Sequence, residues 1–117
     1  MPSPKQFSVL LLDSHEDSLI STAEFLAQEG FEVLQARNLR TAEEIAASRE
    51  VDLLICELER PPETLLDRLR PRRGAIALSS RGVSQEQERC LRSGFQAFLL
   101  KPCTGETLLE SIRRVLG

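Results

Sequence analysis

Five short apolar runs, each of strand length, alternate along the chain with segments whose apolar residues recur at helical spacing. The runs cover residues 7–13, 31–36, 51–57, 75–79 and 97–100. They begin about 20–25 residues apart, which is the length of one strand plus a crossover helix. Because crossovers between parallel strands are right-handed, the pattern predicts one parallel five-stranded sheet with helices on both faces.

The run at 51–57 has no polar face, which is typical of a central strand that is covered on both sides. It ends on Glu57, and the prolines at 61 and 62 cannot continue a central strand. We therefore expect Glu57 at the carboxyl end of the third strand. In open α/β sheets, ligands and chemistry are found at that edge.

The segments between the runs predict helices with recognisable ends. A helix over 62–70 should be stopped by Pro71, and a last helix should cover 104–116. Two capping boxes, Thr41 to Glu44 and Ser84 to Gln87, predict the starts of two more helices. The apolar contacts expected of these helices are Ala42, Ile45, Ala46, Leu65, Leu66, Leu69, Cys90 and Leu91.

Composition restricts the class of protein. The 117 residues are 41% hydrophobic and 28% charged, which predicts a single globular domain over 1–117. A net charge of −3 without a basic cluster argues against nucleic-acid binding, and no apolar run has the length of a membrane span. The three cysteines form no CxxC pair, which favours free thiols in a reducing cytoplasm over a zinc site or disulfides.

Polar residues follow four of the five apolar runs. They are Asp13-Ser14, Glu57, Ser79-Ser80 and Lys101-Pro102. The carboxyl ends of parallel strands share one edge of the sheet, so two acids, hydroxyls and one ammonium should converge on a small pocket.

With these residues in place, the chain resembles the receiver domain of two-component response regulators over nearly its whole length. The resemblance is carried by the run from Val9 to Ser14, the run from Val51 to Glu57 with Pro61, Ile76 to Ser80, Ser93-Gly94, and Phe98 to Pro102. It implies the flavodoxin-like doubly wound sheet with strand order 2-1-3-4-5. It also implies phosphotransfer from a kinase histidine or a small phosphodonor to an aspartate, with Mg²⁺ held by acids at the strand ends. Lys101-Pro102 is implied to be a cis bond.

Three residues depart from the family pattern. Glu57 stands at the position of the phosphoaccepting aspartate, Ser14 replaces the second acid after the first strand, and Phe98 occupies the switch position often held by tyrosine. Mg²⁺ prefers carboxylate oxygens in octahedral geometry, so we expect weak or no Mg²⁺ binding and no other cofactor. Phosphoryl transfer depends on positioning, which the longer Glu57 side chain alters. The sequence thus predicts an atypical receiver without phosphotransfer activity, in which Glu57 pairs with Lys101 and Ser79 can donate to Glu57.

Other interpretations remain open at this point. Glu57 and Lys101 could form only an exposed surface ion pair, Asp13 could be only a helix cap, and His15 is expected to be solvated. A receiver that still accepts a phosphoryl group on Glu57, an unrelated small-ligand protein, and a domain of a longer chain are alternatives.

The expected partners are proteins of a signalling pathway, including a histidine kinase or an output domain. The surface that the family uses comprises the helix at 84–93, the strand at 97–100 and the helix at 104–116. This surface could also form a homodimer. We expect no contact with nucleic acid or membrane.

Overall fold

The computed structural model describes residues 7–57, 61–80 and 84–117. The chain alternates strands and helices: β1 Ser8–Leu12, α1 Glu16–Gln28, β2 Glu32–Ala36, α2 Leu39–Ser48, β3 Leu53–Cys56, α3 Leu65–Leu69, β4 Gly74–Ser79, α4 Ser84–Arg92, β5 Ala97–Leu100 and α5 Gly105–Leu116. All five strands are parallel and lie in the order β2-β1-β3-β4-β5. The predicted flavodoxin-like sheet, with its third strand at the centre, is confirmed.

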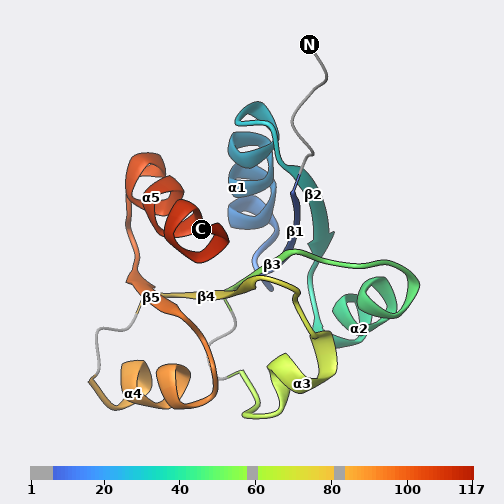
Figure 1. The fold of residues 1–117 in the computed structure, drawn as a ribbon. Helices are drawn as coiled ribbons and strands as arrows, with labels where there is room; N and C mark the ends of the chain where they lie inside the picture. Colours follow the sequence, from blue (N-terminus) through green and yellow to red (C-terminus); the bar gives the residue numbers. More distant parts are fainter. Residues whose placement is uncertain (1–6, 58–60, 81–83) are drawn as a thin grey trace.

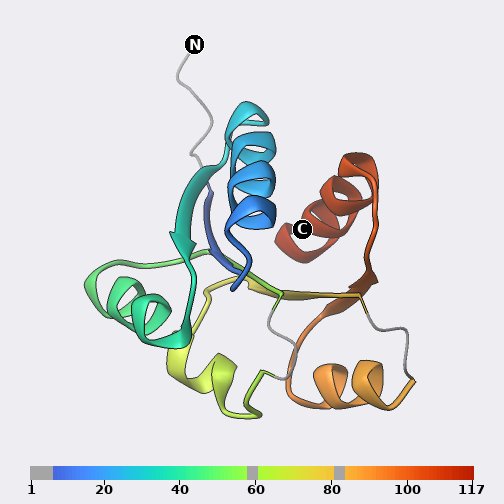
Figure 2. The ribbon, with the colours of Figure 1, turned by 180° about the vertical axis from the view of Figure 1, so that it is seen from behind.

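Helices cover both faces of the sheet, as Figures 1 and 2 show from opposite sides. Helices α1 and α5 pack on one face, and α2, α3 and α4 pack on the other. Alternate residues of β1 serve the two faces, with Leu10 and Leu12 in the core under α2, α3 and α4, and Val9 and Leu11 in the core under α1 and α5. Both faces of the central strands are therefore buried, which explains their continuous apolar runs.

The start of α2 differs from the prediction. Asn38 is the N-cap, and its side chain accepts a hydrogen bond from the Thr41 backbone N–H at 2.9 Å, so Thr41 lies inside the helix. Asn and Thr are both good caps, and the capping box placed the helix start three residues too late. The second box predicted Ser84 as a cap, but Ser84 is already the first residue of α4, and the residue before it lies outside the described residues.

Helix α3 is shorter than the predicted 62–70 and consists of little more than one turn. The backbone N–H of Leu65 bonds to the Pro62 carbonyl, so the two prolines and the residues after them form the turn that leads into the helix. Arg70 ends it in a left-handed conformation with φ 47°, directly before Pro71.

Not every expected core residue is buried. On α4 Cys90 is buried, but its neighbour Leu91 is 44% exposed, because consecutive helical residues point about 100° apart.

Asp52 enters β3 at the edge opposite the strand ends and accepts a hydrogen bond from the Ser8 backbone N–H at 2.9 Å. None of the helices in the described ranges has the length and apolar character of a membrane span.

Candidate functional site

The four polar strand ends meet at one edge of the sheet. Backbone hydrogen bonds continue the sheet pairing past the strands, from Glu57 N–H to the Leu12 carbonyl and from Lys101 N–H to the Ser79 carbonyl, each at 2.8 Å. The backbone at these positions is therefore held by the sheet rather than by a free loop. A cavity of about 180 Å³ lies here, lined by Ser14, His15, Glu57, Leu78, Ser79, Ser80 and Lys101.

Glu57 and Lys101 form a direct ion pair, with 2.8 Å between Lys101 Nζ and Glu57 Oε2. The Glu57 side chain is 3% exposed and the Lys101 side chain 34%. The pair is therefore not an exposed surface ion pair, because the Glu57 side chain is shielded from solvent. Because the carboxylate is withdrawn from water, its attraction to the ammonium is screened less than that of a surface pair.

Ser18 completes a ring of hydrogen bonds with this pair. Its hydroxyl donates to Glu57 Oε2 at 3.1 Å and accepts from Lys101 Nζ at 3.1 Å. Ser18 lies on α1, so the ring joins α1 to the ends of β3 and β5. Ser18 is not among the residues predicted from the sequence, since a serine in the first turn of a helix carries no signal that places it near residues 39 and 83 positions away.

Asp13 is completely buried beside this ring. Its Oδ1 accepts the His15 backbone N–H at 3.0 Å, which makes a local turn before α1. Asp13 is therefore not the helix cap that the sequence left as an alternative, because the N-cap residue is His15 itself. Oδ2 of Asp13 is also buried. While Asp13 and Glu57 are both ionised, no donor among the described residues bonds to this oxygen. A proton shared with Glu57 would supply that donor.

The two carboxyl groups shift each other's pKa in opposite directions. Burial is the largest cause that raises the pKa of Glu57, and the hydrogen bond and charge of Asp13 raise it further against the opposing effect of Lys101. Burial would also raise the pKa of Asp13. The hydrogen bond from the His15 backbone N–H, the neighbouring polar groups of Glu57 and Ser18, and the positive charge of Lys101 together outweigh burial and lower the pKa of Asp13. Glu57 is thus the group of this pair that keeps its proton to higher pH.

These residues do not fit a Mg²⁺ ion well. Such an ion needs about six oxygen ligands in octahedral geometry. The acids at the strand ends are Asp13 and Glu57, and Glu57 Oε2 is already the acceptor for Lys101 and Ser18. The described ranges contain no cluster of three or more His, Cys, Asp or Glu side chains that could hold a metal.

The remaining predicted site residues surround the ring. Ser14 is exposed at the cavity, and His15 is solvated, with 82% of its side chain exposed. Phe98 is half-buried and packs against the core under α2, α3 and α4. The peptide bond between Lys101 and Pro102 is cis, as the resemblance implied.

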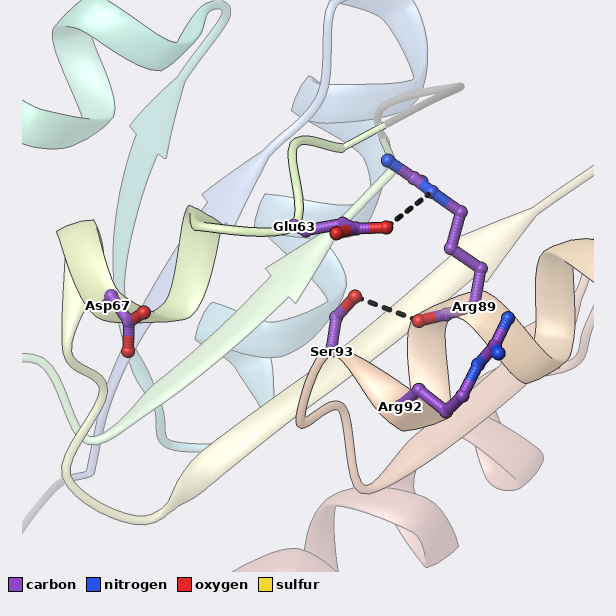
Figure 3. Close-up of a pocket in the computed structure, with 5 residues that line it drawn as sticks. All are labelled: Glu63, Asp67, Arg89, Arg92 and Ser93. Atoms are coloured by element: carbon purple, nitrogen blue, oxygen red, sulfur yellow. Dashed lines mark hydrogen bonds and ion pairs between the residues drawn. The ribbon is translucent and has the colours of Figure 1, made fainter.

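A second polar cavity, of about 490 Å³, lies between α3 and α4 (Figure 3). Arg89 reaches from α4 to the Pro61 carbonyl at 2.7 Å and lies 3.9 Å from Glu63. Arg89 therefore ties α4 to the segment that precedes α3. The cavity also contains Asp67 and Arg92, so acidic and basic groups balance in it.

Comparisons with known proteins agree with this architecture. The chain is 24% identical to the polar-differentiation response regulator DivK of Brucella anthropi, covering 94% of this chain and 96% of that protein. The chemotaxis protein CheY4 of Vibrio cholerae superposes with a TM-score of 0.83 at 22% identity, covering 95% of this chain and 99% of the other. A response regulator from Thermotoga maritima gives 0.84 at 21% identity, covering 95% and 98%.

The family model described as the response regulator receiver domain matches residues 9–113. That range runs from the second residue of β1 through most of α5 and contains every residue of the Asp13, Ser18, Glu57 and Lys101 cluster. The chain therefore belongs to the response regulator receiver domain family.

Proposed function

We propose that this receiver works as a protein-interaction module in signalling and does not depend on a cycle of phosphorylation. The observation that carries the proposal is the partly buried ion pair between Glu57 and Lys101, with 2.8 Å between Nζ and Oε2. Glu57 occupies the position of the family's phosphoaccepting aspartate, and Lys101 the position of the lysine that contacts the phosphoryl group. The two groups that the cycle would use are engaged with each other.

The pair would imitate a phosphorylated aspartate only in part. A glutamate carries one negative charge, whereas a phosphoryl group carries roughly −1.5 to −2. Burial and Asp13 raise the pKa of Glu57, which reduces its charge further as the pH falls. The domain would then be held in one conformation without being fully activated.

Protein partners would be recognised on the surface formed by α4, β5 and α5, either by a signalling partner or by a second copy of the chain. Leu91 on α4 is 44% exposed and Leu100 on β5 is 50% exposed, so this surface would offer apolar as well as charged side chains to a partner. Arg113 and Arg114 of α5 add charge to this side of the fold. A histidine kinase or an output domain is the expected kind of partner.

The alternative function is phosphoryl transfer to Glu57. The observation in its favour is the cavity of about 180 Å³ beside Glu57, where Ser79, Ser80 and Lys101 could surround a phosphoryl group. The reaction would break the bond between phosphorus and the donor's leaving group and form a bond from phosphorus to a Glu57 carboxylate oxygen. Transfer to Oε2 would first require Lys101 and Ser18 to release that oxygen.

Incubation with acetyl phosphate and Mg²⁺, followed by intact mass spectrometry, distinguishes the two functions. We expect an unchanged mass, because metal ligands are few and the acceptor carboxylate is paired. The Ser14→Asp, Glu57→Asp double variant is the control, and it should regain a phosphate adduct. A phosphate adduct mapped to Glu57 in the natural chain would overturn the proposal in favour of the alternative.

A further inference from the structure

A groove between α1 and the start of α5 reaches the Glu57–Lys101 pair and is distinct from the cavity lined by Ser14, His15, Ser79 and Ser80. It has a volume of about 350 Å³. We call it the α1/α5 groove. Its walls include Ser21, Thr22 and Phe25 of α1 and Thr104, Gly105 and Leu108 at α5. Glu57, Lys101, Leu78 and Cys103 also line it, so the ion pair separates this groove from the smaller cavity.

The groove has the composition of a small-molecule site. Such sites have volumes of roughly 300–1,000 Å³ and mostly apolar walls with a few convergent polar groups. Phe25, Leu78 and Leu108 supply apolar walls here, and Lys101 supplies a charged donor. A Cβ on Gly105 would lie 2.5 Å from the Phe25 ring, so the glycine lets the ring lie against the start of α5.

Lys101 indicates which polar group of a ligand the groove could accept. An ammonium has three N–H donors, and Lys101 uses two of them, on Glu57 Oε2 and on Ser18 Oγ. The third has no acceptor among the residues that the structure describes. A ligand oxygen could therefore bind Lys101 without breaking the ion pair.

The surrounding charges favour a neutral oxygen. An anionic ligand would place a third negative charge beside Asp13 and Glu57, which already share the one ammonium. A cationic ligand would face Lys101 and the positive end of the α5 helix dipole. A carbonyl oxygen accepts a hydrogen bond without either cost.

We propose that the α1/α5 groove binds a compact, neutral aromatic carbonyl compound, with its ring against Phe25 and its oxygen on Lys101. Such a ligand would contact the Glu57–Lys101 pair directly. This inference does not require the proposed function, because binding can occur whether or not Glu57 accepts a phosphoryl group.

The test is a titration of ¹⁵N-labelled protein followed by NMR, with benzamide as the probe. A ligand of this size should bind with a dissociation constant on the order of 1 mM. Chemical-shift changes should concentrate at residues 21–25 and 103–108. Benzoate and benzylamine, which place an anion or a cation where benzamide has its neutral amide, should each bind at least about fivefold more weakly.

Two variants place the ligand in the groove. Thr22→Leu fills the groove with a larger apolar side chain and should weaken benzamide binding at least about fivefold. Thr64→Leu, the same change at an exposed position outside the groove, should leave binding unchanged. If Thr22→Leu does not fold, Ser21→Leu at the exposed rim serves in its place.

Cys103 supplies a second measurement. It is half-buried in the groove, whereas Cys56 and Cys90 are buried. Benzamide should slow the reaction of Cys103 with a maleimide. Shift changes outside the groove, equal binding of the three probes, or unchanged binding by the groove-filling variant would overturn the proposal.

Discussion

Glu57 is one methylene longer than an aspartate, and this difference accounts for the chemistry of the site. The extra bond carries the carboxylate roughly 1.5 Å further from the backbone. In the structure that carboxylate lies 2.8 Å from Lys101 Nζ and 3.1 Å from Ser18 Oγ. The carboxyl end of β3 thus holds an ion pair built from the chain's own side chains.

We expect Glu57 and Lys101 to be coupled energetically. A double-mutant cycle with Glu57→Gln and Lys101→Met, measured by denaturant unfolding, should give a coupling free energy above the ~0–1 kcal/mol of exposed pairs. The reason is that the Glu57 side chain is only 3% exposed. A coupling near zero would show that the two side chains are neighbours without a net interaction.

Ser18→Ala should destabilise the fold by about 0.5–1.5 kcal/mol, because it removes the hydroxyl that bridges Glu57 and Lys101. Ser21→Ala is the matched control on the same helix, since Ser21 is exposed. Chemical denaturation of both variants measures the difference. Equal stabilities for the two variants would contradict the bridging role of Ser18.

The raised pKa of Glu57 predicts a pH dependence of stability. Because the folded state holds this proton more tightly than the unfolded chain, the free energy of unfolding should fall as pH rises from the ordinary glutamate pKa through the raised one. Asp13 acts oppositely at lower pH, where its lowered pKa makes stability fall as pH falls through that value. Comparing the unfolding free energy of the natural chain and Glu57→Gln across this range isolates the first effect. An identical pH profile for both would disprove it.

At the scale of the elements, the sheet was easier to predict than the ends of the helices. Alternation of apolar runs with helical patterns placed all five strands to within two residues at each end. Helix α2 starts at Leu39 because Asn38 caps it, and α3 shrinks to 65–69 because a proline turn precedes it and Arg70 ends it. Such ends depend on which of several suitable side chains reaches a free N–H, and local sequence does not decide that.

The cap of α2 can be tested directly. Asn38→Ala should destabilise the protein by about 1 kcal/mol, because the Thr41 N–H loses its acceptor. Thr41→Ala keeps both that N–H and its acceptor on Asn38, so it should destabilise the protein less than Asn38→Ala does. Thermal unfolding of the two variants decides between Asn38 and Thr41 as the cap. A larger loss for Thr41→Ala would favour the capping box.

At the scale of the molecule, the sheet topology gathers groups that are far apart in sequence. Residues of α1, β3 and β5 form one hydrogen-bonded ring because β1, β3 and β4 are adjacent and all strands point the same way. The same edge opens into two cavities, one on each side of the Glu57–Lys101 pair. A molecule bound in either cavity would contact that pair.

The acids at this edge should bind Mg²⁺ weakly. Calorimetric titration should show no saturable binding well below millimolar concentration, because Lys101 competes for Glu57 and Ser14 contributes no carboxylate. The Ser14→Asp, Glu57→Asp variant should bind more tightly. Saturable binding by the natural chain at micromolar concentration would contradict this expectation.

The sequence by itself determined the parallel sheet, its central third strand and the edge at which Asp13, Glu57, Ser79 and Lys101 gather. The parallel sheet and its edge follow from the period of the apolar runs and from the handedness of crossovers, and the central place of the third strand follows from the absence of a polar face in 51–57. Only the tertiary structure decided that Ser18 joins the Glu57–Lys101 pair and that α1 and α5 leave a groove beside Lys101. It also decided that Asp13 is buried and that no donor among the described residues bonds to its Oδ2. Those features depend on how side chains from separate elements fill the same space, and no pattern along the chain records that.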